Sequence, residues 1–186
     1  MENLIYLPLL ALLSACFPSA AQSQTATHYF LKIDGIPGES RDDNHPNEID
    51  VLSLSLGVVQ PQLQRFAGGM ASAAKTEISP ISLTKFLDKS SPLLFINCAT
   101  GKRIPTATIT AERDDSAFDF FTITLADVLI SSVSQGASEG GIVESMSSSF
   151  TKLTLTYVPQ NPNGSAAVPV TVSFDLKANK TFTTPQ

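Results

Sequence analysis

Alternation of apolar and polar residues with a period of two is the feature that most limits what this chain can fold into. The clearest run is Val168 to Leu176, in which every second residue is apolar. Side chains of a β-strand point alternately to opposite faces, so the pattern predicts a half-buried strand. Comparable runs occupy residues 29–33, 49–58, 77–87, 104–112, 118–134 and 143–158. About eight strands separated by turn signals indicate a closed barrel or a sandwich.

Two details of this pattern lead to specific predictions about the second half of the chain. Residues 135–141 contain three glycines, and we interpret them as a loop. In the run 143–158 the apolar phase shifts between Phe150 and Leu153, which predicts a β-bulge within one long strand.

One segment departs from the β pattern and predicts a short helix. Ser90 and Ser91 offer a hydroxyl N-cap, and Pro92 stands at the first helical position, where its missing N–H has no cost. Gly101 is a typical C-terminal stop. Because residues 93–98 are apolar on almost every side, we expect this helix to be packed into the domain.

A polar segment between the first two strands is the best candidate for a functional surface. The strand at 29–33 ends at the turn signal Asp34-Gly35, and residues 39–48 contain no aliphatic side chain. We therefore predict an exposed loop outside the core, longer than a hairpin needs, and such loops are often functional. The candidate contact residues are Arg41, Asp42, Asp43, Asn44, His45, Asn47 and Glu48.

Composition and charge exclude several function classes. With 186 residues, 42% of them hydrophobic and 16% charged, the chain is typical of one globular domain. Its formal net charge is −5, and no basic stripe is present to neutralise phosphates. We therefore expect no nucleic-acid partner.

The sequence gives little support for catalysis, for a cofactor or for a metal. It contains neither a G-x-S-x-G elbow nor an H-E-x-x-H motif, and its histidines are His28 and His45. A metal site would need carboxylates such as Asp42 or Asp43 beside them. We favour a solvated or protein-contacting loop over a metal site, and Cys98 has no evident partner for nucleophilic catalysis. No enzyme activity and no cofactor are predicted.

The first 21 residues differ from the rest and predict export. Residues 4–16 are continuously apolar, about the length of a signal-peptide core and too short to span a bilayer comfortably, and small residues follow at 19–21. We interpret residues 1–21 as a signal peptide and 22–27 as a polar linker, so that the protein is secreted or periplasmic. As an alternative, Leu13 to Cys16 resembles a lipobox, and acylation of Cys16 would make an outer-membrane lipoprotein. Only that alternative implies contact with a membrane.

Several long segments resemble the haemolysin-coregulated protein (Hcp) family, the tube subunit of type VI secretion. They are YFLKIDGIPGES at 29–40, TKFLDKSSPLL at 84–94, CATGK at 98–102, YVPQ at 157–160 and DLKANK at 175–180. The segments occur in the family's order and span nearly all of residues 28–182. The resemblance implies a mainly β fold, a compact β-barrel of two sheets with one short packed α-helix, at residues 28–182, followed by a tail at 183–186.

The same resemblance implies a structural role with several protein partners. Family members assemble as homohexameric rings that stack into a tube, which meets a spike protein and a contractile sheath and transports effector cargo. The polar loop Arg41–Glu48 would contact the next subunit or ring. No cofactor and no catalysis are implied. Because the chain ends soon after its last strand, no fused toxin domain is expected.

The leader is the one departure from the family pattern, since family members begin just before the first strand. Three explanations remain open. The start could be assigned too far upstream, or the leader could be retained for another purpose. The third explanation is a divergent paralogue outside the cytoplasm, an exported β-barrel acting as a periplasmic or extracellular binding module without tube assembly.

Overall fold

The computed structural model describes residues 26–60, 76–116 and 118–182, so the predicted signal peptide, the lipobox with Cys16 and the tail at 183–186 lie outside the described residues. The described ranges form twelve strands and one helix. In chain order these are β1 (Thr27–Ile33), β2 (Ile49–Val51), β3 (Ser53–Ser55), β4 (Val58–Val59), β5 (Glu77–Ile78), β6 (Ile81–Phe86), α1 (Ser91–Thr100), β7 (Arg103–Arg113), β8 (Phe121–Ser138), β9 (Gly141–Ser149), β10 (Lys152–Tyr157), β11 (Val170–Asp175) and β12 (Lys180–Thr181).

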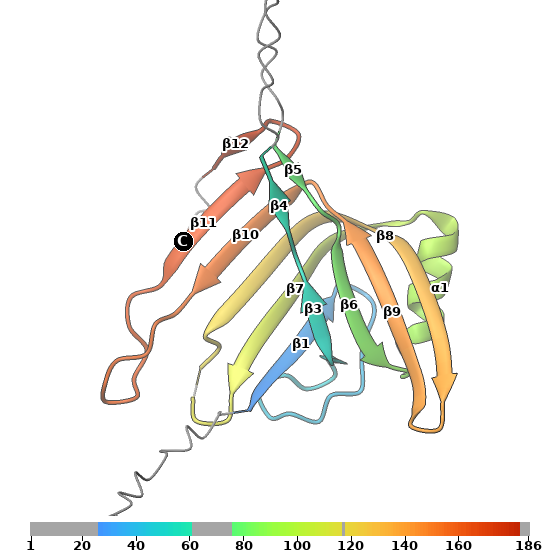
Figure 1. Ribbon diagram of the computed structural model, residues 1–186, viewed down its shortest axis with the longest axis horizontal. Helices are drawn as coiled ribbons and strands as arrows, with labels where there is room; N and C mark the ends of the chain where they lie inside the picture. The colour runs from blue at the N-terminus through green and yellow to red at the C-terminus, as the bar shows by residue number, and fades with distance from the viewer. Residues whose placement is uncertain (1–25, 61–75, 117, 183–186) are drawn as a thin grey trace, which may run out of the picture.

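Strand pairing organises the molecule around a circuit with an open extension (Figure 1). The segment 49–55 pairs with β1 through β2 and with β6 through β3, and β6, β9, β8 and β7 complete the circuit back to β1. Strands β10, β11 and β12 continue from β8 as a wing, and β4 and β5 form a separate two-stranded ribbon. The predicted mainly β fold with two sheets and one helix is confirmed. The ten-stranded sheet as a whole is not a closed barrel, because the wing leaves the circuit.

Strand β8 is longer than the sequence pattern predicted, and two predictions around it are wrong. Residues 135–141 are not a loop: β8 continues to Ser138 and pairs there with Gly141, the first residue of β9. The phase shift near Phe150 is not a bulge within one strand but the break between β9 and β10. Both strands pair with β8, but β9 has β6 on its other side and β10 has β11.

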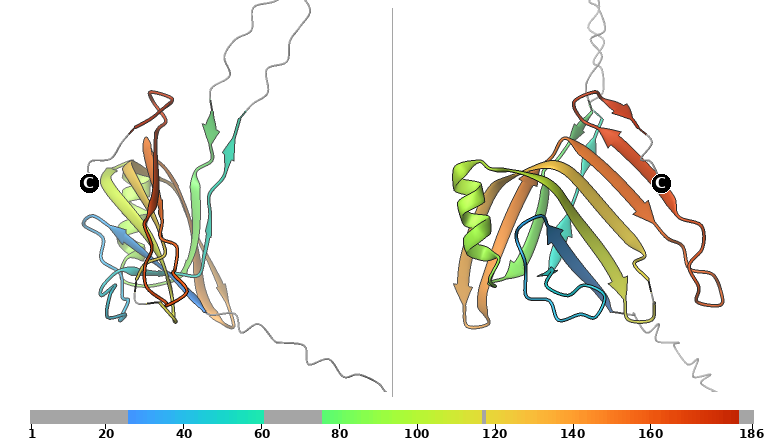
Figure 2. Two further views of the ribbon diagram at one scale, coloured as in Figure 1. Left: turned by 90° about the vertical axis from the view of Figure 1, so that its left-hand side faces the viewer. Right: turned by 180° about the vertical axis from the view of Figure 1, so that it is seen from behind.

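The predicted helix is present, with two differences in detail. Pro92 lies in its first turn, and Gly101 ends it in the left-handed conformation at φ 64°. The Ser90 hydroxyl does not cap the helix but donates a 2.5 Å hydrogen bond to Asp88. The helix lies on one side of the sheet against β8 (Figure 2). It buries Leu94 there but leaves Leu93, Phe95 and Ile96 exposed, so the prediction that it is packed on all sides is wrong.

The core fills the inside of the strand circuit with aliphatic side chains that alternate along the strands. Fully buried members from every side of the circuit include Leu31, Ile49, Ile81, Ile109, Ile123, Leu125 and Ile130, with Leu94 from the helix. Their burial follows from the period-two pattern, because each lies on the inward face of its strand. The wing is different: Val168, Val170 and Val172 have the same alternation but are 83%, 60% and 57% exposed.

A buried group of charges joins the helix to the sheet. Lys85 on β6 is 2% exposed, and its ammonium donates to Asp88 at 2.8 Å and to Ser91 of α1 at 3.0 Å. It also lies 3.4 Å from the carboxylate of Glu144 on β9, which is fully buried. The second oxygen of Glu144 accepts a 2.7 Å hydrogen bond from Gln135 of β8. Buried charges are tolerated only when paired, so this group specifies how four elements fit together.

We expect Lys85→Met to destabilise the fold by about 3–5 kcal/mol, because it leaves two buried or half-buried carboxylates without their cation. The matched control is Lys152→Met, whose exposed cation lies 3.8 Å from Asp175 and should matter by less than about 1 kcal/mol. Urea unfolding followed by circular dichroism measures both. Equal effects of the two substitutions would show that the buried pair adds nothing.

Candidate functional site

The 39–48 loop is held closed by its own backbone. Gly38 donates to the carbonyl of Asn47 at 2.8 Å, Ser40 to that of Glu48 at 2.9 Å, and Asn47 donates back to Ser40 at 3.0 Å. Asn47 adopts a positive φ of 60°, which asparagine tolerates better than most residues. A Cβ on Gly38 would overlap the carbonyl group of Glu48, so only glycine allows this close approach.

His45 is the centre of the loop. Its side chain is buried, and its ring stacks on that of Phe30 with centroids 4.3 Å apart. Nδ1 lies 3.1 Å from Glu48 and Nε2 lies 3.0 Å from Asp119, in the segment between β7 and β8. The expectation of a solvated loop outside the core is wrong for His45, because its imidazole fills the interior of the loop that aliphatic residues would otherwise fill.

The surroundings of His45 favour its charged form. Burial by itself lowers the pKa of His45, but the hydrogen bond and charge of Asp119, together with those of Glu48, outweigh it and raise the pKa above the usual 6.5. A third carboxylate, that of Glu112, lies 3.8 Å from Nε2. An imidazolium with both N–H groups donating to carboxylates therefore connects the 39–48 loop to the β7–β8 segment.

The other predicted contact residues divide into two kinds. Asp42 is half-buried and accepts hydrogen bonds from the backbone N–H groups of Asn44 at 2.8 Å and His45 at 3.1 Å. Asn44 donates to Glu112 at 2.9 Å, and Glu48 is half-buried against the imidazole. The side chains of Arg41, Asp43, Asn44 and Asn47 are exposed on the outer surface of the loop.

Sequence reasoning missed Glu112 and Asp119. They lie 68 positions from Asn44 and 74 from His45, and only the pairing of β1 with β7 brings their segment to the loop. The available signal was the acidic run at 112–119, which contains four carboxylates in eight residues.

Asp42, His45 and Glu112 are the described residues that could hold a metal ion, since their ligand atoms lie within 4.8 Å of one another. Both nitrogens of His45 already hydrogen-bond to Asp119 and Glu48, and one oxygen of Asp42 accepts two backbone hydrogen bonds. A metal would have to replace these bonds. The arrangement is that of a cluster of ion pairs which stabilises a loop.

Comparisons with known proteins identify the family. The model of the family described as "Type VI secretion system effector, Hcp" matches residues 30–157. The chain is 35% identical over 159 residues to the protein hcp1 of Pseudomonas aeruginosa, covering 83% of this chain and 98% of that protein. This chain belongs to the Hcp family. Its resemblance to type VI secretion tube proteins is thereby confirmed.

Solved structures with Hcp folds superpose on most of the chain. Hcp1 from Salmonella typhimurium has a TM-score of 0.71 at 32% identity, covering 84% of this chain and 99% of that one. A structure described as a type six secretion system protein has a TM-score of 0.77 at 26% identity, covering 84% and 100%. Within the described ranges, no helix is both long and apolar enough to cross a bilayer.

We expect His45 to stabilise the fold more at acidic than at alkaline pH. Because its pKa is raised in the folded state, its contribution is fully present below pH of about 6.5 and is lost as the pH rises through the folded pKa. The difference in unfolding free energy between the natural protein and His45→Gln should be larger at about pH 5.5 than at about pH 9.

The control for this measurement is His28→Gln, because His28 forms an exposed pair with Asp114 that water and salt screen. Urea unfolding at several pH values measures both variants. A His45→Gln effect that does not change with pH would contradict the ion-pair cluster described here.

Proposed function

We propose that this Hcp family member is a structural tube subunit, which assembles as a hexameric ring of identical copies that stack into a tube and transport effectors. Family membership over most of the chain is the observation that supports this function best. By family resemblance the tube meets a spike protein and a contractile sheath, and the protein is secreted.

The exposed apolar surface of the wing supports assembly. Val168, Val170 and Val172 are more than half exposed, and Tyr157 beside Val170 is 45% exposed. On the opposite face of the wing, Thr154 and Ser173 form a polar pair at 2.9 Å. Monomeric proteins rarely expose a contiguous apolar surface of this kind, which is typical of subunit interfaces.

The 39–48 loop supports a contact role in a different way. Its exposed side chains Arg41, Asp43, Asn44 and Asn47 are displayed by a backbone that is already fixed by hydrogen bonds and by the His45 ion pairs. A preorganised surface loses little conformational entropy on binding. We propose that these residues contact the next subunit or ring, as the sequence predicted.

Purified residues 22–186 should therefore form hexamers, seen as a sixfold monomer mass in light scattering and as rings in negative-stain microscopy. Val170→Asp with Val172→Asp should shift this species to monomers, because the carboxylates would be buried at the interface. Thr154→Asp, on the polar face of the wing, is the matched control. A natural protein that stays monomeric at high concentration would contradict the tube function.

The second candidate is an exported Hcp paralogue that binds a partner outside the cytoplasm without forming tubes. The observation that favours it is the apolar run at residues 4–16, which is typical of a signal peptide. A copy exported by this route would not enter a sheath assembled in the cytoplasm. In this case the protein is periplasmic or extracellular, or a lipoprotein of the outer membrane if Cys16 is acylated.

Mass spectrometry of the mature N-terminus distinguishes these cases. We expect a chain that begins at residue 22, because small residues precede that position. A diacylglyceryl group on an N-terminal Cys16 would instead show a lipoprotein. An intact Met1 in secreted material would contradict signal-peptide cleavage.

A further inference from the structure

One end of the molecule is strongly acidic. It consists of the 41–48 segment and the β7–β8 segment 112–120, which the His45–Asp119 and Asn44–Glu112 hydrogen bonds hold side by side. This acidic end contains seven carboxylates and two arginines, a net charge of −5 before protonation of His45 is counted. Its carboxylates are Asp42, Asp43, Glu48, Glu112, Asp114, Asp115 and Asp119. The half-buried rings of Phe118 and Phe120 lie in the same segment.

The opposite end of the molecule is basic. It consists of the turn after α1, the start of β10 and the turn from β11 to β12, which the Lys177–Asp127 and Arg103–Asp127 ion pairs and the Lys152–Asp175 pair hold together. This basic end contains five cations and two carboxylates, a net charge of +3. Its cations are Lys102, Arg103, Lys152, Lys177 and Lys180.

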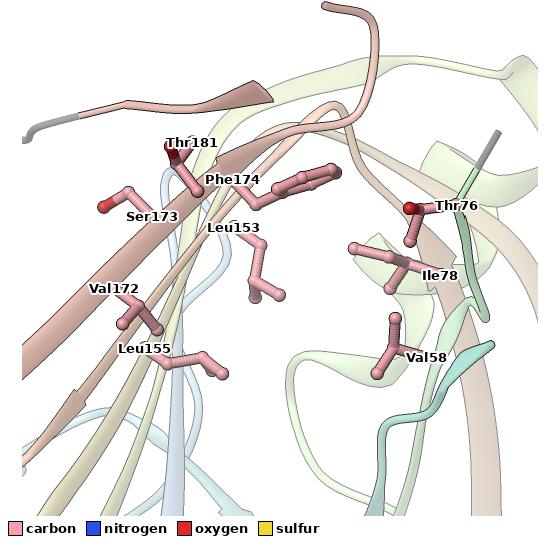
Figure 3. A pocket seen from close by; sticks show the side chains of 9 residues that line it. All are labelled: Val58, Thr76, Ile78, Leu153, Leu155, Val172, Ser173, Phe174 and Thr181. Carbon is pink, nitrogen blue, oxygen red and sulfur yellow. The ribbon is translucent and has the colours of Figure 1, made fainter. Parts of the chain in front are cut away.

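An apolar cleft opens beside these cations, between the wing and the β4–β5 ribbon (Figure 3). Its volume is about 310 Å³. The ribbon contributes Val58 and Ile78, and the wing contributes Leu153, Leu155, Val172 and Phe174. In Figure 3 the side chains of Val58 and Ile78 point from the ribbon toward those of the wing across the open space. Lys152 and Lys180 are the direct chain neighbours of the lining residues Leu153 and Thr181.

Strand β7 separates the two ends. It begins at Arg103, in the basic end, and its last residues, Glu112 and Arg113, lie in the acidic end. At about 3.3 Å per residue, the strand places the ends about 33 Å apart. Each copy therefore has an acidic surface with phenylalanines at one end and a basic surface beside an apolar cleft at the other.

We propose that the basic end and its cleft bind the acidic end of a second copy of this chain, head to tail. Opposite charges favour this pairing and disfavour contact between two like ends. A contact between different surfaces at opposite ends propagates in one direction. It would therefore join successive rings in the tube, so its place in the tube rests on the proposed ring assembly. The apolar cleft would bury the phenylalanine side of the acidic end.

Charge reversal at each end of the full chain tests the contact. The basic-end variant is Lys102→Glu with Lys180→Glu, and the acidic-end variant is Asp43→Lys with Asp114→Lys; all four side chains are exposed. Sedimentation velocity measures species larger than a ring. For each variant, the protein concentration needed to form these species should rise by at least about tenfold. An equimolar mixture of the two variants should restore them, because unlike ends then meet again.

Salt and an unrelated charge change complete the experiment. Raising the salt from about 0.05 M to about 0.5 M shortens the Debye length to about 4 Å and should dissolve the stacks while leaving rings intact. Lys32→Glu, exposed in the middle of β1, should stack like the natural protein. Unchanged stacking in both reversed variants, no restoration on mixing, or a natural protein without stacks would overturn the proposal.

Failure of ring formation has a different signature. If rings are absent at both salt concentrations, the tube function fails, and the head-to-tail contact is then measured on single chains. Salt-sensitive association that each reversal abolishes and mixing restores would still support the contact, and its absence would overturn it.

Discussion

The hydrogen bonds of β8 are the constraint on which the rest of this structure depends. Its 18 residues pair with β7 on one side and, in succession, with β10 and β9 on the other. Because β9 and β10 divide this edge at Phe150–Thr151, the chain can join β6 on one side of the break and β11 on the other. The circuit that encloses the core and the wing that leaves it both follow from this division.

Two buried charged groups connect what the strand ladder alone would leave loose. Lys85, paired with Asp88 and Glu144, fixes the start of the helix against the sheet. His45, between Glu48 and Asp119, fixes the polar loop against the β7–β8 segment. In each case a buried charge needs its partners, so the elements that supply them cannot move apart without a large electrostatic cost.

The arrangement of surfaces follows from these constraints and suits a protein that binds copies of itself. The wing exposes valines that continue the inward face of β8 beyond the core, so one sheet supplies both a hydrophobic core and an apolar surface. The two ends of β7 collect opposite charges. An Hcp family member needs no cavity for a small substrate to perform a structural function, and apolar and charged surfaces on one rigid sheet are sufficient for assembly.

The sequence by itself determined the mainly β class, the positions of most strands, the single helix between Ser91 and Gly101, and the family, because these depend on local periodicity, capping and long matching segments. The tertiary structure decided what each face meets. Alternation was the same at Ile123, which is buried, and at Val170, which is exposed, since a period of two defines faces but not their partners. Likewise, the polar loop was correctly placed outside the strands. The burial of His45 could not be predicted, because the carboxylate that holds it lies 74 residues away and arrives only through the pairing of β1 with β7.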